Sequence, residues 1–200
     1  MERLITIFTP TYNRAYTLPK LYESLKSQTN QNFDWVIVDD GSTDNTEVLI
    51  KSFIDEGIIQ ITYVRQKNQG KHIAINTGVA LAKGDFFIVI DSDDYLLENC
   101  IETCYALMER VKEENIAGFT FIHFAENIQY DATKYNNKIW FYDEEGEFHW
   151  EHWGEMAFCY KTEIAKKYPF PQFEGEKFCP ESLVHRRIGK LYRVLYTNYV

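Results

Sequence analysis

The sequence predicts an α/β fold with a mostly parallel, Rossmann-like central sheet and helices on both of its faces. Short runs rich in β-branched and aromatic residues alternate with amphipathic stretches of helical period. Several strand-like runs end in polar, turn-forming residues, as expected where parallel strands reach their carboxyl edge. The 200 residues are enough for one α/β domain with a sizeable core.

The expected elements follow one another in strict alternation over the first part of the chain. Strands are expected at 3–9, 33–39, 59–65, 86–91 and 116–124, with a last strand at 193–200. Helices are expected at 16–28, 44–55, 70–82 and 96–112. The first helix places Leu18, Leu21, Tyr22 and Leu25 on one face. This spacing implies βαβ crossovers and therefore parallel strands.

Three carboxylates follow the fourth expected strand. The apolar residues Phe87 to Ile90 lead directly into Asp91-Ser92-Asp93-Asp94. Crowding like charges at the end of a strand is costly unless a positive charge lies among them. The Asp-Ser-Asp pattern therefore predicts a hard divalent cation held by oxygen ligands and shared with the phosphates of a substrate. The alternative is that one carboxylate caps the helix that starts near Leu96.

Two other strand ends carry polar groups to the same edge. The run Phe33 to Val38 is followed by Asp39 to Asp44, in which capping of the next helix accounts for the last three residues. Asp39 is then left at the strand tip, where a carboxylate can accept hydrogen bonds from a base or a ribose. The first strand ends in Thr9 to Arg14, which brings an aromatic ring and a guanidinium.

Composition and missing motifs exclude several classes of function. The sequence has neither Gly-x-Gly-x-x-Gly nor Gly-x-x-x-x-Gly-Lys-Ser/Thr, so phosphates must be met by a metal and side chains. A net charge of −9 argues against nucleic acid and against a polybasic membrane patch. No apolar run approaches the ~18 residues of a membrane span, and no signal-peptide pattern opens the sequence. The four cysteines show no zinc spacing, and a cytosolic protein would keep them reduced.

Taken in order, the motifs resemble those of glycosyltransferase family 2, the inverting nucleotide-sugar transferases of GT-A type. The matching pieces are Pro10-Thr11-Tyr12-Asn13-Arg14, Val38 to Asp44, Asn68-Gln69-Gly70-Lys71, Asn76-Thr77-Gly78, Gly84-Asp85 and Asp91 to Asp94. The resemblance spans residues 3–112 and implies a GT-A-type fold. It implies one glycosyltransferase domain over 1–200, in which 1–112 bind the nucleotide-sugar and 113–200 bind the acceptor and supply the base. It also leads us to expect a native chain that continues beyond Val200.

The resemblance assigns roles to individual residues. Asp93 would ligate Mn²⁺ or Mg²⁺ directly, and Asp91 would bind the ribose or a metal-bound water. Asp39 would pair with the base, and Lys71 would lie near the base or the phosphates, although a solvated lysine at a helix start is the alternative. The donor-binding residues expected in this way are Pro10, Tyr12, Asp39, Lys71, Asp91 and Ser92.

An inverting transfer also needs a general base for the acceptor hydroxyl. The resemblance points to Glu181 in the segment Cys179 to Ile188, with Glu176 as the alternative. The segment departs from the family pattern, because Pro180 replaces a glutamate and Glu181 replaces an aspartate. Trp150 and Trp153 could stack on an acceptor sugar, although packing over the sheet explains such rings as well. His149 and His152 are interpreted as surface or packing residues, because a third metal ligand is missing.

The predicted function is transfer of a hexose or N-acetylhexosamine from a nucleotide-diphosphate sugar to a glycan or lipid-linked acceptor, as in bacterial surface polysaccharide synthesis. A UDP-sugar is the preferred donor on family grounds. The expected location is the cytoplasm, with peripheral association of the full-length protein at the inner face of the membrane. A catalytically silent nucleotide-sugar or glycan-binding module is the alternative. A nucleotidyltransferase is disfavoured, because Thr9 to Arg14 is not a glycine-rich loop bearing Arg or Lys.

Overall fold

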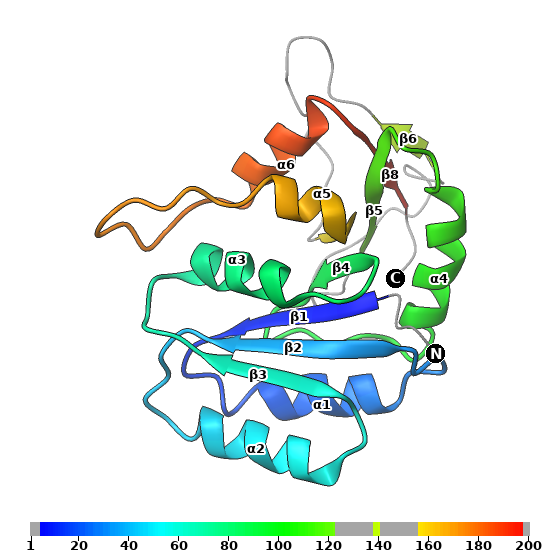
Figure 1. Ribbon diagram of the computed structural model, residues 1–200. Coiled ribbons are helices and arrows are strands. Elements are labelled where there is room, and N and C mark those ends of the chain that lie inside the picture. The colour runs from blue at the N-terminus through cyan, green and yellow to red at the C-terminus, as the bar shows by residue number, and fades with distance from the viewer. Residues whose placement is uncertain (1–4, 123–137, 141–155, 198–200) are drawn as a thin grey trace.

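The computed structural model describes residues 5–122, 138–140 and 156–197, and its central feature is one mixed β-sheet (Figure 1). The strands are β1 (Ile5–Thr11), β2 (Phe33–Asp39), β3 (Ile61–Arg65), β4 (Phe86–Val89), β5 (Ile116–Ile122), β6 (Lys138–Trp140), β7 (Met156–Lys161) and β8 (Arg193–Tyr196). The helices are α1 (Leu18–Lys26), α2 (Thr46–Glu56), α3 (Lys71–Leu81), α4 (Cys100–Arg110), α5 (Thr162–Lys167) and α6 (Ser182–Gly189).

The eight strands of the described part lie in the order β3-β2-β1-β4-β7-β5-β8-β6. β1 pairs in parallel with β2 and β4, β2 pairs in parallel with β3, and β5 pairs in parallel with β8. β7 lies antiparallel between β4 and β5, and β6 is antiparallel to β8. The mostly parallel α/β sheet predicted from the sequence is therefore confirmed.

Helices cover both faces of the sheet, and each face has its own apolar core. On one face, buried side chains of α1, α2 and α4 pack on the strands, and the Tyr22 ring stacks on Phe53 with centroids 3.9 Å apart. On the other face, α3, α5 and α6 contribute buried residues such as Ala74, Ile164 and Ile188 to a second apolar cluster with side chains of the sheet. The apolar residues predicted to share one face of the first helix are thus the buried residues of α1.

The antiparallel strand β7, which lies between β4 and β5, was not predicted from the sequence. β7 begins within the segment from 139 to 160, which is rich in aromatic residues and lacks a clear period of two. β7 brings Phe158 and Tyr160 to the α3, α5 and α6 face of the sheet, beside β4. A helix also begins later than predicted: α4 starts at Cys100, not near Leu96. Among the described residues, no helix is long and apolar enough to cross a membrane.

A glycine fixes how closely α3 approaches the sheet. A Cβ added at Gly78 would overlap the ring of Phe8, a fully buried residue of β1. We expect Gly78→Ala to lower the free energy of unfolding by up to about 2 kcal/mol, because overpacking costs about 1–3 kcal/mol and helix propensity returns about 1 kcal/mol.

Urea unfolding of the purified chain measures this change. Ala80→Ser is the matched control, because Ala80 is exposed on the same helix, and its effect should stay within about 0.5 kcal/mol. A Gly78→Ala protein more stable than the parent would mean that helix propensity, rather than the contact with Phe8, decides this position.

Candidate functional site

The loops that follow β1 and β2 are hydrogen-bonded to each other at the carboxyl edge of the sheet. The Asn13 backbone N–H donates to Ser42 Oγ (2.9 Å), and the Thr43 backbone N–H donates to Asn13 Oδ1 (2.7 Å). Asn13 adopts a left-handed conformation with φ 53°, which asparagine tolerates better than most residues. This pairing holds the loop that carries Tyr12, whose side chain is 48% exposed, next to the end of β2. Pro10, two residues before Tyr12, is buried inside β1.

Asp39 lies fully buried at the end of β2 and already has polar partners. Its Oδ1 accepts from the Ser42 backbone N–H (2.7 Å), and its Oδ2 accepts from the Tyr63 hydroxyl (2.9 Å). Burial, followed by this hydrogen bond, raises the pKa of Tyr63 well above its usual range. Arg65 Nε lies 3.9 Å from Asp39 Oδ2. Each carboxylate oxygen retains the capacity for a second hydrogen bond, although the Asp39 side chain is fully buried in this structure.

Asp40, which the sequence analysis left without a role, organises the turn that leads into α3. Its Oδ1 accepts from Gln66 Nε2 and from the Gln69 backbone N–H (both 2.9 Å), and its Oδ2 accepts from the Gly70 backbone N–H (2.7 Å). Gly70 has a φ of +96°, and an added Cβ there would overlap the carbonyl oxygen of Lys177. The α5–α6 loop therefore lies directly against the start of α3.

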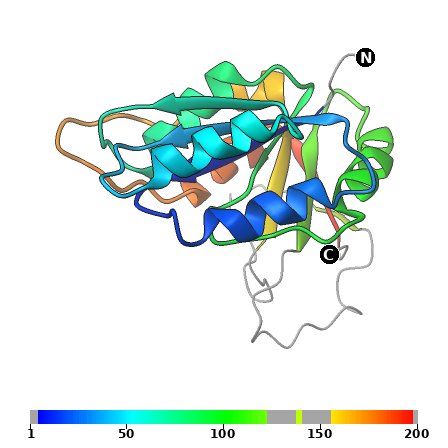
Figure 2. The same cartoon turned by 90° about the horizontal axis from the view of Figure 1, so that it is seen from below.

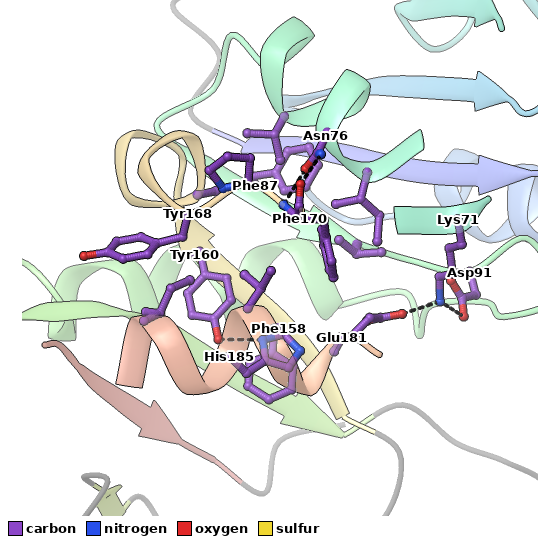
Figure 3. Close-up of a pocket in the computed structure, with 18 of the residues that line it drawn as sticks. Lys71, Asn76, Phe87, Asp91, Phe158, Tyr160, Tyr168, Phe170, Glu181 and His185 are labelled. Atoms are coloured by element: carbon purple, nitrogen blue, oxygen red, sulfur yellow. Dashed lines mark hydrogen bonds and ion pairs between the residues drawn. The ribbon is translucent and has the colours of Figure 1, made fainter. Parts of the chain in front are cut away.

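Lys71, at the first position of α3, joins two carboxylates from distant parts of the chain (Figure 3). Its Nζ lies 2.8 Å from Asp91 Oδ2 and 2.6 Å from Glu181 Oε1. Burial alone would lower the pKa of Lys71, but the charges of Glu181 and Asp91 outweigh it and raise that pKa to about 12. Lys71 is therefore a permanent cation between the end of β4 and the start of α6.

The Asp91 to Asp94 segment does not cap the next helix. The residue before α4 is Asn99, whose side chain makes no capping hydrogen bond, and the Ile101 backbone N–H in the first turn donates to Gln28 Oε1 (3.0 Å). Asp91 Oδ1 is buried and has no hydrogen-bond partner, which is costly for a carboxylate oxygen unless a ligand supplies one. The Asp93 side chain is 52% exposed, and its Oδ2 lies 3.9 Å from Arg14 Nη2. Ser92 is buried between the two aspartates.

These oxygens fit a divalent cation only if a substrate completes the coordination sphere. Within the described ranges, no group of three or more His, Cys, Asp or Glu side chains could hold a metal ion without a substrate. Asp91 and Asp93 would supply hard oxygen ligands, and phosphate oxygens would supply the others, as for cations bound together with substrate phosphates. The unpartnered Oδ1 of Asp91 is the observation that favours such a ligand.

A pocket of about 270 Å³ opens beside Lys71, Asp91 and Glu181 and extends between α3, α5 and α6 over β4 and β7 (Figure 3). Most of its lining is apolar, with residues such as Ile75, Phe87 and Val184.

The two candidate bases occupy different places. Glu181 lines the pocket, whereas Glu176 is exposed on the α5–α6 loop, where its Oε1 accepts from the Phe178 backbone N–H (3.0 Å). Figures 1 and 2 both show this loop projecting beyond the edge at which β1 and β2 end. Trp150, Trp153, His149 and His152 lie outside the described residues.

The parallel sheet and the charged groups at its carboxyl edge form a ligand site where open α/β folds bind their ligands. The family model described as glycosyl transferase family 2 matches residues 6–168, so the chain belongs to glycosyltransferase family 2.

One relative and two solved structures illustrate what this chain is similar to. "Glycosyltransferase GlyG" of Streptococcus pneumoniae is 34% identical over 119 residues, which are 59% of this chain and 39% of GlyG. Residues 1–349 of Staphylococcus aureus TarS, solved with UDP, superpose with a TM-score of 0.78 at 19% identity, covering 98% of this chain and 58% of that one. The mannosyltransferase PcManGT of Pyrobaculum calidifontis, solved with GDP-Man and Mn²⁺, gives 0.68 at 19% identity, covering 97% and 54%. The last two comparisons show a shared GT-A fold.

Proposed function

We propose that this chain transfers a hexose or N-acetylhexosamine from a nucleotide-diphosphate sugar to a hydroxyl of a glycan or lipid-linked acceptor, with inversion at the anomeric carbon. The observation that carries the proposal is the ion-paired set Lys71, Asp91 and Glu181 at the mouth of a pocket. It brings together a cation for a diphosphate, a carboxylate for a metal or ribose, and a carboxylate that can accept a proton.

In this proposal the nucleotide lies along the carboxyl edge of the sheet. Tyr12, exposed on the loop after β1, offers a ring face to the base, and Asp39 accepts hydrogen bonds from it. Asp93 and Asp91 would hold Mn²⁺ or Mg²⁺ together with the diphosphate. PcManGT, which has this fold, was solved with GDP-Man and Mn²⁺, and TarS was solved with UDP, which supports a divalent cation and a nucleotide donor.

The proposed transfer is a single displacement at the anomeric carbon. Glu181 takes the proton of the acceptor hydroxyl, the hydroxyl oxygen forms a bond to the anomeric carbon, and the bond from that carbon to the diphosphate oxygen breaks. Negative charge then develops on the departing diphosphate, and the Lys71 ammonium is placed to stabilise it. A bound divalent cation would add further stabilisation of the same charge.

We place the reaction in the cytoplasm, with the acceptor belonging to bacterial surface polysaccharide synthesis. The net charge of −9 disfavours nucleic acid or an anionic bilayer as a direct partner. A lipid-linked acceptor would bring the enzyme to the inner face of the membrane without requiring a basic patch. The match to this chain covers less than half the length of GlyG. Any activity assigned to the whole protein is therefore part of the proposal.

A thermal-shift series tests the donor class. We expect UDP with Mn²⁺ to raise the melting temperature, because a ligand at 100 times its Kd stabilises the folded state by about 2.7 kcal/mol. GDP and dTDP serve as nucleotide controls, and a chelator should remove most of the UDP effect. If none of these nucleotides shifts the melting temperature, the proposed function fails.

Hydrolysis of a UDP-sugar in the presence of Mn²⁺ separates an enzyme from a silent binding module. We expect slow release of UDP and free sugar, because water can replace an absent acceptor. Nucleotide binding with no hydrolysis and no transfer would favour the binding module.

A further inference from the structure

A polar pair lines the same pocket as the charged residues Lys71, Asp91 and Glu181. The Tyr160 hydroxyl of β7 and His185 Nδ1 of α6 are 2.9 Å apart. The imidazole also stacks on Phe158, with ring centroids 3.8 Å apart and planes inclined by 15°. His185 follows Glu181 by four residues, one turn of α6, and both line the same pocket (Figure 3). Whatever binds there is therefore close to the proposed reaction centre.

The second ring nitrogen of His185 is available to a ligand. Nε2 makes no hydrogen bond in the described part of the chain, and it is not among the buried side-chain atoms that lack a partner, so it remains accessible. Holding an imidazole among apolar side chains is unfavourable unless its polar atoms find partners. Tyr160 satisfies Nδ1 and fixes the ring, which leaves Nε2 as the free hydrogen-bonding atom.

The surroundings define the chemistry that this atom can bind. Burial, assisted by the positive charge of Lys71, lowers the pKa of His185 to about 3, so the imidazole is neutral near pH 7. A neutral imidazole suits a neutral hydrogen-bonding group better than a phosphate or a carboxylate. Nearby lining residues such as Phe158, Val184 and Ile188 favour an adjoining apolar group.

The amide of Asn76, also on the pocket wall, is already used. Its Nδ2 donates to the Phe170 carbonyl (2.9 Å), and its Oδ1 accepts from the Phe170 backbone N–H (2.8 Å). A sugar ring pushed deep into this pocket would leave several hydroxyls without partners, which is costly. An acetamido group brings one N–H, one carbonyl and one methyl, so one neutral nitrogen can pair with one of its two polar atoms while the apolar walls receive its methyl group.

We infer that this pocket receives the acetamido group of an N-acetylated sugar, with His185 Nε2 hydrogen-bonded to the amide and the methyl group against Phe158 and Val184. The inference rests on the proposed function and narrows its substrate to acetamido sugars. Tyr160 positions the His185 imidazole through the hydrogen bond to Nδ1. The same chemistry applies whether the acetamido group belongs to the donor or to the acceptor.

Calorimetric titrations with Mn²⁺ present distinguish the two sources. The donor arm compares UDP-N-acetylglucosamine with UDP-glucose, and UDP alone reports on the proposed function. The acceptor arm, with UDP bound, compares 4-nitrophenyl N-acetyl-β-D-glucosaminide with 4-nitrophenyl β-D-glucoside. We expect a preference of about tenfold or more for the acetamido sugar in one arm, because a group built to bind an amide discriminates against its absence.

His185→Phe keeps a ring stacked on Phe158 and removes the nitrogen, so the preference should fall about tenfold in the same arm. His185→Gln supplies a neutral hydrogen-bonding group again and should restore part of the preference. Tyr192→Phe, outside the pocket lining, is the control for general effects of an aromatic substitution and should keep the preference. A melting curve of each variant confirms that it is folded.

Three results would overturn the inference while leaving the proposed function in place, provided that UDP binds. The first is equal affinity for the paired ligands in both arms. The second is a preference that His185→Phe does not change. The third is tight binding of both nitrophenyl glycosides but of neither N-acetylglucosamine nor glucose when these sugars are titrated in the same way, which would assign the pocket to an apolar aglycone. If UDP itself does not bind, the proposed function and the inference fall together.

Discussion

Glu181→Gln is expected to lower the rate of sugar transfer about 10²–10⁴-fold, the usual contribution of a positioned proton acceptor. Glutamine keeps the length of the side chain and its hydrogen-bonding reach, but it cannot take the proton of the acceptor hydroxyl. The loss should fall on kcat and leave the KM for the donor nearly unchanged, because the missing interaction forms only in the transition state. Steady-state transfer assays with a varied UDP-sugar concentration measure both constants.

The fold should survive this substitution. Lys71 retains its contact with Asp91 when Glu181 becomes neutral, and the carboxylate that is lost is about 40% exposed. Ion pairs exposed to this extent contribute about 0–1 kcal/mol. A melting temperature close to that of the parent protein would therefore accompany the loss of activity.

Glu176→Gln is the matched control for Glu181→Gln. Glu176 lies five residues earlier on the exposed α5–α6 loop, and its carboxylate accepts a hydrogen bond from the Phe178 backbone N–H. We expect only a small change in transfer rate, since Glu176 is not part of the pocket lining. If Glu176→Gln is the more damaging substitution, then Glu176 is the base, and the position of Glu181 beside Lys71 has another purpose.

The parallel part of the sheet was predictable because its signals are local. Each strand from β1 to β4 is a short apolar run, and polar turn residues follow it at the edge where ligands bind. The positions of Asp39 and Asp91 at that edge followed from the same local pattern. The antiparallel strand β7 gave no comparable signal, because its place between β4 and β5 depends on pairing with strands far away in the sequence.

The contacts within the site were less predictable than its residues. Lys71 and Glu181 were both named from motifs, but nothing in their sequence spacing indicates that one ammonium contacts both Glu181 and Asp91. Asp39 has two partners, Tyr63 and Arg65, on the neighbouring strand β3. These two contacts could have been anticipated only from the register of the strands. The pairing of Tyr160 with His185 depends on β7 and α6 meeting in space.

Asp93→Asn should abolish most activity, by about 10²-fold or more, and leave the fold intact. In the proposed site Asp93 is the direct protein ligand of the divalent cation, and such a cation contributes several kcal/mol of charge stabilisation in the transition state. In the unliganded protein its charge lies close in sequence to those of Asp91 and Asp94, so removing it relieves repulsion. The ion pair with Arg14, at 3.9 Å and half exposed, contributes about 0–1 kcal/mol. The melting temperature should therefore hold or rise.

Titration of UDP into the Asp93→Asn protein, with and without Mn²⁺, checks the metal assignment. In the parent protein we expect Mn²⁺ to tighten UDP binding about tenfold or more, the equivalent of about 1.4 kcal/mol. In Asp93→Asn this gain should largely disappear, while the weak metal-free binding through Tyr12 and Asp39 should remain. Asp55→Asn, which removes an exposed carboxylate at the end of α2, should behave like the parent. If UDP binds Asp93→Asn as tightly as the parent when Mn²⁺ is present, then Asp93 does not hold the metal.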